Sequence, residues 1–313
     1  MLENITSLKN KNGALSWINI TNAQDSELAY LKKKFKFNEV DLQDSHTQNT
    51  AQRPKFYFRG NYCFLILQFP FYNKHNRTIE AEEINFFIGK NYIITVHRDR
   101  LPPIIELFNT CYSDKFYAEQ YLGGSNTMML YDIIVRLQEY CYPILDHLSI
   151  DVQSIEKNIF AGREREMMRE SLLAKRNILN FRRIMEAHRD VLHKIAKAKV
   201  SFFNVEKSKI YYGDLIDHTK NIWDILNGQK EMIEALESTN TSLVSFRLND
   251  IMRLLTLFSV IVFPLTLIAG IFSMRIDNSM PFIDQPYGFW LIVGIMATIS
   301  LIMLFFFKRK RWM

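Results

Sequence analysis

The chain has 313 residues, of which 48% are hydrophobic and 23% are charged, and its formal net charge is +6. Its 24 Phe and 14 Tyr exclude a disordered chain, and three Cys in this length exclude a secreted disulfide scaffold. The positive charge is local, because residues 1–150 hold 16 basic and 16 acidic residues whereas residues 151–200 hold 12 and 7. A chain-wide polycation is therefore excluded, and we expect no nucleic-acid partner.

The first part of the chain, residues 1–118, has the pattern of a small α+β domain. Residues 15–20 predict a strand, and residues 26–37 have helical spacing after a turn and cap at 21–25. β-Branched and aromatic runs at 55–71 and 83–96 predict neighbouring strands. We expect the acidic cluster Glu80, Glu82 and Glu83 to form a solvated strand edge.

Residues 119–253 predict a cytoplasmic helical stalk. Apolar residues recur at steps of three and four through 125–199, and a second long helix begins near Val205. A helix from Asp214 to Phe272 would be about 88 Å long at ~1.5 Å per residue, and would continue unbroken into a membrane. His188 and His193 are five residues apart and do not share a helix face, so we expect both at the surface.

Motifs typical of enzymes are missing from the sequence. It contains no phosphate-binding glycine loop, no Cys-x-x-Cys pair and no His-Glu-x-x-His motif. We therefore expect no enzymatic activity. Cys63, Cys111 and Cys141 are most simply interpreted as reduced thiols of the core.

Two uncharged runs, residues 254–274 and 287–307, predict membrane spans. Each has 21 residues, enough to cover a hydrocarbon core of ~30 Å at ~1.5 Å per residue. The loop 275–286 has one basic residue, whereas the tail 308–313 contains four consecutive basic residues. By the positive-inside rule both termini lie in the cytoplasm of a cell (inner) membrane protein. The tail also indicates contact with membrane lipids.

Polar and small residues follow one face of the first span and of the segment before it. Ser245, Asn249, Met252, Thr256, Ser259, Phe263, Thr266 and Gly270 are separated by steps of three or four. Hydroxyls that bond to their own helix, or small residues that mediate helix packing, would explain the pattern. A polar pore lining would also explain it, and because two helices cannot enclose a water path, a lining requires an oligomer.

Ordered motifs over nearly the whole chain resemble the CorA-type divalent-cation channels. They include residues 17–20 (WINI), 52–55 (QRPK), 89–97 (GKNYIITVH), 212–218 (YGDLIDH), 249–256 (NDIMRLLT), 263–266 (FPLT) and 269–271 (AGI). The resemblance implies a funnel-shaped homopentamer with an α+β cytoplasmic domain, a stalk helix that continues into the inner span, and an outer span. Mg²⁺ or another divalent cation would be the transported and regulatory ion, with no covalently bound cofactor.

The resemblance also implies roles for individual residues. Asn249, Met252, Leu255, Ser259, Phe263, Thr266 and Gly270 match pore-lining positions, and Met252 and Leu255 match an apolar gate. Asp214 matches a metal-sensing carboxylate, with Asp44 of a neighbouring subunit as its partner. The alternative interpretation of Asp214 is an exposed helix acid.

The end of the first span departs from the family. Where the family has Gly-Met-Asn, this chain has Ser273, Met274 and Arg275. The Asn presents an amide oxygen to the hydrated cation, whereas Arg has no acceptor and stays protonated. Divalent-cation transport driven by the membrane potential is the first interpretation. The alternatives are altered selectivity (Zn²⁺, other transition metals or anions) and a non-conducting sensor or scaffold.

Overall fold

The computed structural model describes residues 4–10, 14–47, 52–274 and 287–310. They divide into two compact units, Met1–Glu237 and Ser238–Met313. Helix α9 (Lys209–Ser273) contributes its first part to one unit and the rest to the other. The predicted domain end at residue 118 lies inside α4 (Lys115–Leu122).

The first unit is built on a six-stranded sheet with the strand order β1-β2-β6-β5-β4-β3. Its strands are β1 (Ile5–Lys9), β2 (Ser16–Thr21), β3 (Lys55–Phe58), β4 (Cys63–Asn73), β5 (Thr78–Ile88) and β6 (Tyr92–His97). β2 and β6 are parallel and the other neighbours are antiparallel. The centre of the sheet is covered on both faces, which explains why β4 and β5 consist largely of apolar residues.

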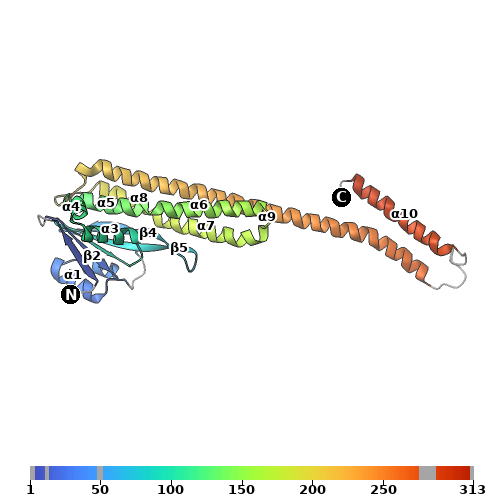
Figure 1. Cartoon of the computed structure of the whole chain (residues 1–313), viewed down its shortest axis with the longest axis horizontal. Helices are drawn as coiled ribbons and strands as arrows, with labels where there is room; N and C mark the ends of the chain where they lie inside the picture. The colour runs from blue at the N-terminus through green and yellow to red at the C-terminus, as the bar shows by residue number, and fades with distance from the viewer. Residues whose placement is uncertain (1–3, 11–13, 48–51, 275–286, 311–313) are drawn as a thin grey trace. The chain divides into compact units, whose positions relative to one another are not determined.

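Helices α1 (Asp25–Phe35) and α2 (Glu39–Asp44) cover one face of the sheet. A capping box between Gln24 and Glu27 begins α1. After α1 the chain turns inward at Phe37, whose ring stacks on Phe87 with centroids 4.4 Å apart. Figure 1 shows α1 on one side of the sheet and α6 and α7 on the other.

Helices cover the other face. They are α3 (Pro102–Ser113), α4, α5 (Asn126–Glu139), α6 (Cys141–Phe160), α7 (Glu164–Glu186) and α8 (His188–Ala196). The short strands β7 (Lys199–Val200) and β8 (Phe203–Asn204) and the turn η1 (Glu206–Ser208) precede α9. Gly162, at a φ of +90°, permits the tight turn between α6 and α7. The Asn177 side chain fixes α7 to the sheet by accepting from the Ile79 amide at 3.0 Å. The three Cys are buried free thiols, as predicted.

Two predictions about polar residues are wrong. His188 is fully buried, because its ring packs edge-on against Phe69 at 4.9 Å and contacts the Gln68 carbonyl at 2.5 Å. Glu82 is also buried, because β5 is a central strand and Arg100 supplies a partner for its carboxylate at 3.0 Å. Burial raises the pKa of Glu82 and lowers that of His188 to about 4.

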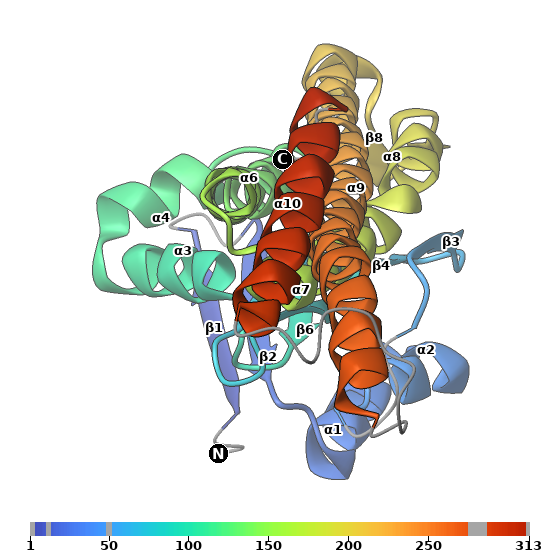
Figure 2. The same cartoon turned by 90° about the vertical axis from the view of Figure 1, so that its right-hand side faces the viewer.

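The second unit contains the end of α9 and helix α10 (Gly288–Arg309). Both helices are long and apolar enough to cross a membrane. Most of their side chains are exposed in the isolated chain, including Phe258, Phe263, Trp290 and Phe305. Figure 2 shows α9 and α10 in an oblique, foreshortened view. The predicted loop 275–286, with Arg275, and residues 311–313 of the tail lie outside the described residues.

Candidate ion pathway and metal-sensing carboxylates

Helix α9 has an outer face that the rest of its own chain leaves uncovered. The residues of this outer face follow one another at alternating steps of three and four along the whole helix. All of them are exposed except Ser259, which is half-buried. They are Ile210, Asp214, Asp217, Asn221, Asp224, Gly228, Glu231, Ala235, Ser238, Ser242, Ser245, Asn249, Met252, Thr256, Ser259, Phe263, Thr266, Gly270 and Ser273. Aside from Ile210, Met252 and Phe263, every member is polar or small.

The inner face of α9 in the first unit has the opposite character. Its apolar residues are fully buried, among them Leu215, Ile222 and Leu226. Gln138 of α5 donates to the Leu215 carbonyl at 3.0 Å and to the Thr219 hydroxyl at 2.8 Å. These buried contacts set the rotation of α9 about its axis, and therefore which residues remain outside.

The hydroxyls of the first span bond to their own helix. Thr256 donates to the Met252 carbonyl at 2.7 Å, Ser259 to Leu255 at 2.9 Å, and Thr266 to Val262 at 2.8 Å. Such bonds satisfy each hydroxyl hydrogen. They agree with the explanation that the hydroxyls of this face bond to their own helix. Each oxygen keeps a lone pair that can accept from water. The bonds are therefore compatible with both a back-bonded helix and a lining of acceptors.

The predicted pore residues all lie on α9. Met252, Leu255 and Phe263 are 59%, 60% and 71% exposed, so nothing in the same chain covers them. A Cβ added at Gly270 would meet no atom within 4 Å. Pro264 lies within α9 next to Phe263, and it has no backbone N–H to donate. Of the predicted signature residues, Ser273 ends α9, Met274 is exposed, and Arg275 is not described.

Asp214 lies on the outer face of α9 with a side chain that is 51% exposed. Its carboxylate accepts from the Tyr131 hydroxyl at 3.3 Å and lies 3.6 Å from His218 Nε2. Burial, followed by the Asp214 charge, raises the pKa of Tyr131. The carboxylate keeps accessible lone pairs, which a cation from solvent can reach.

Asp44 is the last residue of α2 and is less accessible, with a side chain 16% exposed. Lys55 of β3 pairs with its carboxylate at 2.5 Å. No contact joins Asp44 to Asp214 among the described residues of one chain, so a shared site requires two copies. A cation at Asp44 would have to displace or share the Lys55 ammonium.

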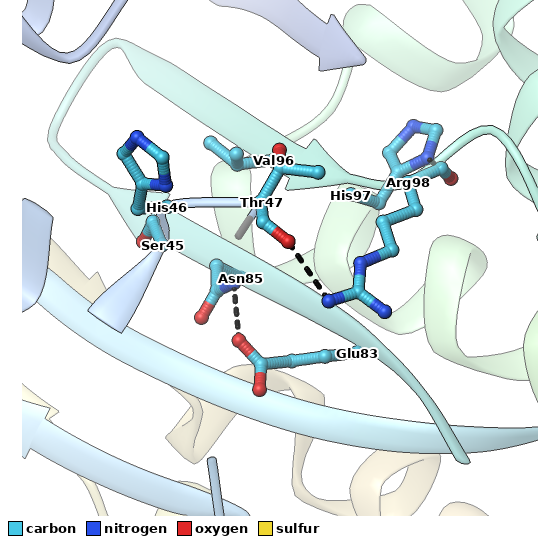
Figure 3. Close-up of a pocket in the computed structure, with 8 residues that line it drawn as sticks. All are labelled: Ser45, His46, Thr47, Glu83, Asn85, Val96, His97 and Arg98. Carbon is cyan, nitrogen blue, oxygen red and sulfur yellow. Dashed lines mark hydrogen bonds between the residues drawn. The ribbon is translucent and has the colours of Figure 1, made fainter. Parts of the chain in front are cut away.

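The segment after Asp44 closes over a small polar cavity of about 30 Å³, which Figure 3 shows. Asn85 donates to Glu83 at 2.7 Å, and the Arg98 guanidinium donates to the Thr47 carbonyl at 2.8 Å. Burial raises the pKa of Glu83. The resident guanidinium makes this cavity unfavourable for a metal ion, and its size suits one or two water molecules. We interpret the hydrogen bonds around this cavity as the contacts that hold the segment after Asp44 in place.

The acids that precede Ser245 on the same face were not among the predicted site residues. Asp217, Asp224 and Glu231 are exposed and continue the steps of three and four toward the start of α9. Extending that step backwards along the sequence would have found them. No group of three or more His, Cys, Asp or Glu side chains in the described part of the chain is arranged to hold a metal ion.

A sheet domain followed by two helices, α9 and α10, that are long and apolar enough to cross a membrane defines a membrane protein with a large domain outside the bilayer. The model of the family described as "CorA-like Mg2+ transporter protein" matches residues 12–309. The chain therefore belongs to the CorA-like Mg²⁺ transporter family. It is a divalent metal-ion transporter of the cell membrane with a cytoplasmic N-terminal domain, and not an enzyme.

Individual relatives agree with this assignment. The putative metal ion transporter YfjQ of Bacillus subtilis is 27% identical over 299 residues, covering 95% of this chain and 89% of its own. The cobalt/magnesium transport protein CorA of Thermotoga maritima is 27% identical over 305 residues, covering 95% and 83%. The complete structure of the CorA magnesium transporter from Methanocaldococcus jannaschii has a TM-score of 0.83 at 23% identity, covering 96% and 92%. The last similarity confirms the predicted fold.

Proposed function

We propose that the chain forms a homopentameric channel in which the outer face of α9 lines a pore for divalent cations, Mg²⁺ first. The observation that carries this proposal is the unbroken outer face from Ile210 to Ser273. An isolated copy would leave the hydroxyl oxygens of Thr256, Ser259 and Thr266 toward lipid, where their remaining lone pairs find no donor. Self-association turns that face toward other copies and toward water.

The spacing of the outer face supports a supercoiled bundle. Its average step is 3.5 residues, whereas a straight helix has 3.6 residues per turn and drifts by ~20° per heptad. Over the length of α9 the drift would carry the face about half-way around the helix. A left-handed supercoil keeps such a face on the bundle axis. The mostly small or polar residues would leave room for water at that axis.

The charges along α9 support a cation pathway. Asp214, Asp217, Asp224 and Glu231 would place rings of carboxylates along the cytoplasmic part of the bundle, which raise the local concentration of cations. At about −100 mV, two charges moving inward gain ~4.6 kcal/mol, so no other energy source is needed. The names of the Thermotoga and Methanocaldococcus relatives, which specify magnesium, support Mg²⁺ as the ion.

We further propose that Asp214 and Asp44 of neighbouring subunits bind a regulatory divalent cation. The exposed Asp214 carboxylate supports this, because hard cations prefer carboxylate ligands. Its partner Asp44 would exchange Lys55 for the ion. A regulatory site of this kind would link the cytoplasmic Mg²⁺ concentration to subunit contacts.

A second candidate function is a pore of altered selectivity, and Arg275 is the observation that favours it. A ring of arginines in place of amide oxygens would repel cations at the outer mouth. Purified protein in liposomes, tested separately with Mg²⁺, Zn²⁺, Co²⁺ and Cl⁻ under an imposed potential, distinguishes the candidates. We expect Mg²⁺ flux above that of empty liposomes. Faster Cl⁻ than Mg²⁺ flux would favour the anion alternative, and no flux of any ion would contradict both.

A further inference from the structure

Helices α3, α4 and α5 of the first unit surround an open cleft of about 410 Å³, remote in sequence from the proposed pore. Figure 2 shows α3 and α4 side by side. The volume is within the range of small-molecule sites. The polar and aromatic residues that line the cleft are Glu106, Tyr117, Tyr121, Arg136, Glu139 and Tyr140.

The charges of this cleft are opposite in sign to that of the whole chain. The charged residues that line it are two carboxylates and one guanidinium, whereas the net charge of the chain is +6. Arg136 is already engaged, because it lies 3.7 Å from Glu139 and donates to the Tyr121 hydroxyl at 3.4 Å. No basic side chain of the described residues forms an ion pair with Glu106. An anionic carboxylate therefore remains available beside three tyrosines.

We propose that this cleft binds a small organic cation, of the alkylammonium or guanidinium class. Aromatic rings attract organic cations through the negative potential of their faces, and desolvation strengthens the attraction. Glu106 supplies the opposite charge, and Leu107 and Pro103 supply apolar contact for a carbon stem. The ring of Phe116 meets the ring of Tyr117 edge-on, with centroids 5.8 Å apart.

Other occupants fit the lining less well. Mg²⁺ gives up its water reluctantly and needs oxygen ligands in octahedral positions, whereas much of this cleft is aromatic and aliphatic. An inorganic anion would meet two carboxylates and an arginine that is already paired. An organic cation uses both the aromatic and the anionic parts of the lining.

Choline and putrescine are suitable probes, titrated into the full-length protein in detergent without Mg²⁺. We expect saturable binding by calorimetry and a rise in melting temperature. Glu106→Gln should raise Kd about three- to fivefold, and Tyr117→Leu should raise it by a similar factor, as expected for losing an accessible charge or a cation–π contact. Melting without ligand verifies that both variants are folded.

Two control variants distinguish this cleft from general attraction to acids. Asp146→Asn removes an exposed carboxylate from α6, outside the cleft, and should leave Kd unchanged. Asp214→Asn, which removes a carboxylate from the outer face of α9, should also leave Kd unchanged. Loss of binding in Asp214→Asn but not in Glu106→Gln would overturn the proposal. So would the absence of saturable binding up to roughly 50 mM of either probe, which corresponds to an affinity too weak to be specific.

Discussion

The two faces of α9 differ in almost every property although they alternate along one helix. The inner face consists mainly of buried apolar residues, and its buried Thr219 accepts a hydrogen bond from Gln138 of α5 at 2.8 Å. The outer face carries acids, hydroxyls and small residues, and nothing in its own chain covers it. Apolar burial stabilises the subunit, whereas the uncovered face contributes little to it. Folding of the subunit accounts for the first face, and the proposed assembly around a pore would account for the second.

The largest expected effect comes from Leu226→Ala on the inner face. Leu226 is fully buried, so its truncation should cost about 2–5 kcal/mol, as the lost burial adds to an unfilled cavity. A melting temperature lower by roughly 5–15 °C is the expected result in fluorescence-detected unfolding. The matched variant Asp224→Ala, two residues earlier on the outer face, should change the stability of the subunit by less than about 0.5 kcal/mol. Equal losses would contradict the assignment of the two faces.

Burial also predicts an acid-sensitive stability through His188. Its pKa is about 4 in the folded chain against an ordinary 6.5, because burial disfavours the charged ring. Between these values the unfolded state binds more protons, so stability is complete above pH 6.5 and decreases as pH falls toward 4, by about 3 kcal/mol at most. Melting temperatures measured from pH 7 to 4 should fall less steeply for His188→Gln than for the wild type.

Half-buried His193 on the same helix provides the control for this experiment, and His193→Gln should retain the wild-type slope. Glu82 and Glu83 act in the opposite direction, because burial raises their pKa values. Comparing variants in one pH series cancels their contribution. A wild-type slope in His188→Gln would show that the imidazole does not govern the acid response.

Elements whose signal is local were predictable from the sequence, whereas features that depend on packing were not. Uncharged runs of 21 residues, and mostly polar or small residues at steps of three or four, are visible in the sequence without knowledge of packing, so both spans and α9 were predictable. The burial of His188 and Glu82 was not, because it depends on contacts between separate elements: Phe69 of β4 packs on His188, and Arg100, in the turn after β6, pairs with Glu82. The Lys55 partner of Asp44 was missed for the same reason.

Arg275→Asn should produce the largest change in transport. If five arginines lie ~8 Å from a divalent ion, each pair costs ~1 kcal/mol in water, or ~5 together, and salt reduces this to ~2. We expect divalent flux into liposomes at low external concentration to rise about tenfold or more. Arg275→Ala should recover part of that gain, because it removes the charge without restoring an oxygen ligand. Unchanged flux in Arg275→Asn at low salt would show that the side chain does not face the pore.

Asp214→Asn and Asp44→Asn test the cytoplasmic carboxylates. Binding between subunits stabilises the assembled state by mass action, so millimolar Mg²⁺ should raise the melting temperature of the wild type. Each variant should reduce that rise by a few degrees, because a neutral amide is a weaker ligand than a carboxylate. Glu231→Gln, on the same face of α9, serves as the control and should keep most of it. Wild-type shifts in both Asp variants would rule out the shared site.

The smallest effect we expect distinguishes a lining hydroxyl from a merely back-bonded one. Thr266 donates to the Val262 carbonyl at 2.8 Å, and Thr298 of α10 donates to Gly294 at the same distance. Replacing either by Val removes the hydroxyl at nearly constant shape and leaves the helix bond pattern otherwise intact. If only α9 lines the pore, Thr266→Val removes a ring of acceptors for the hydration shell of the ion and should lower Mg²⁺ flux about two- to fivefold, the range of one modest hydrogen bond. Thr298→Val, which removes the same group from the outer span, should leave flux unchanged. Equal flux in both variants would mean that the hydroxyls of α9 serve their own helix, as those of α10 do.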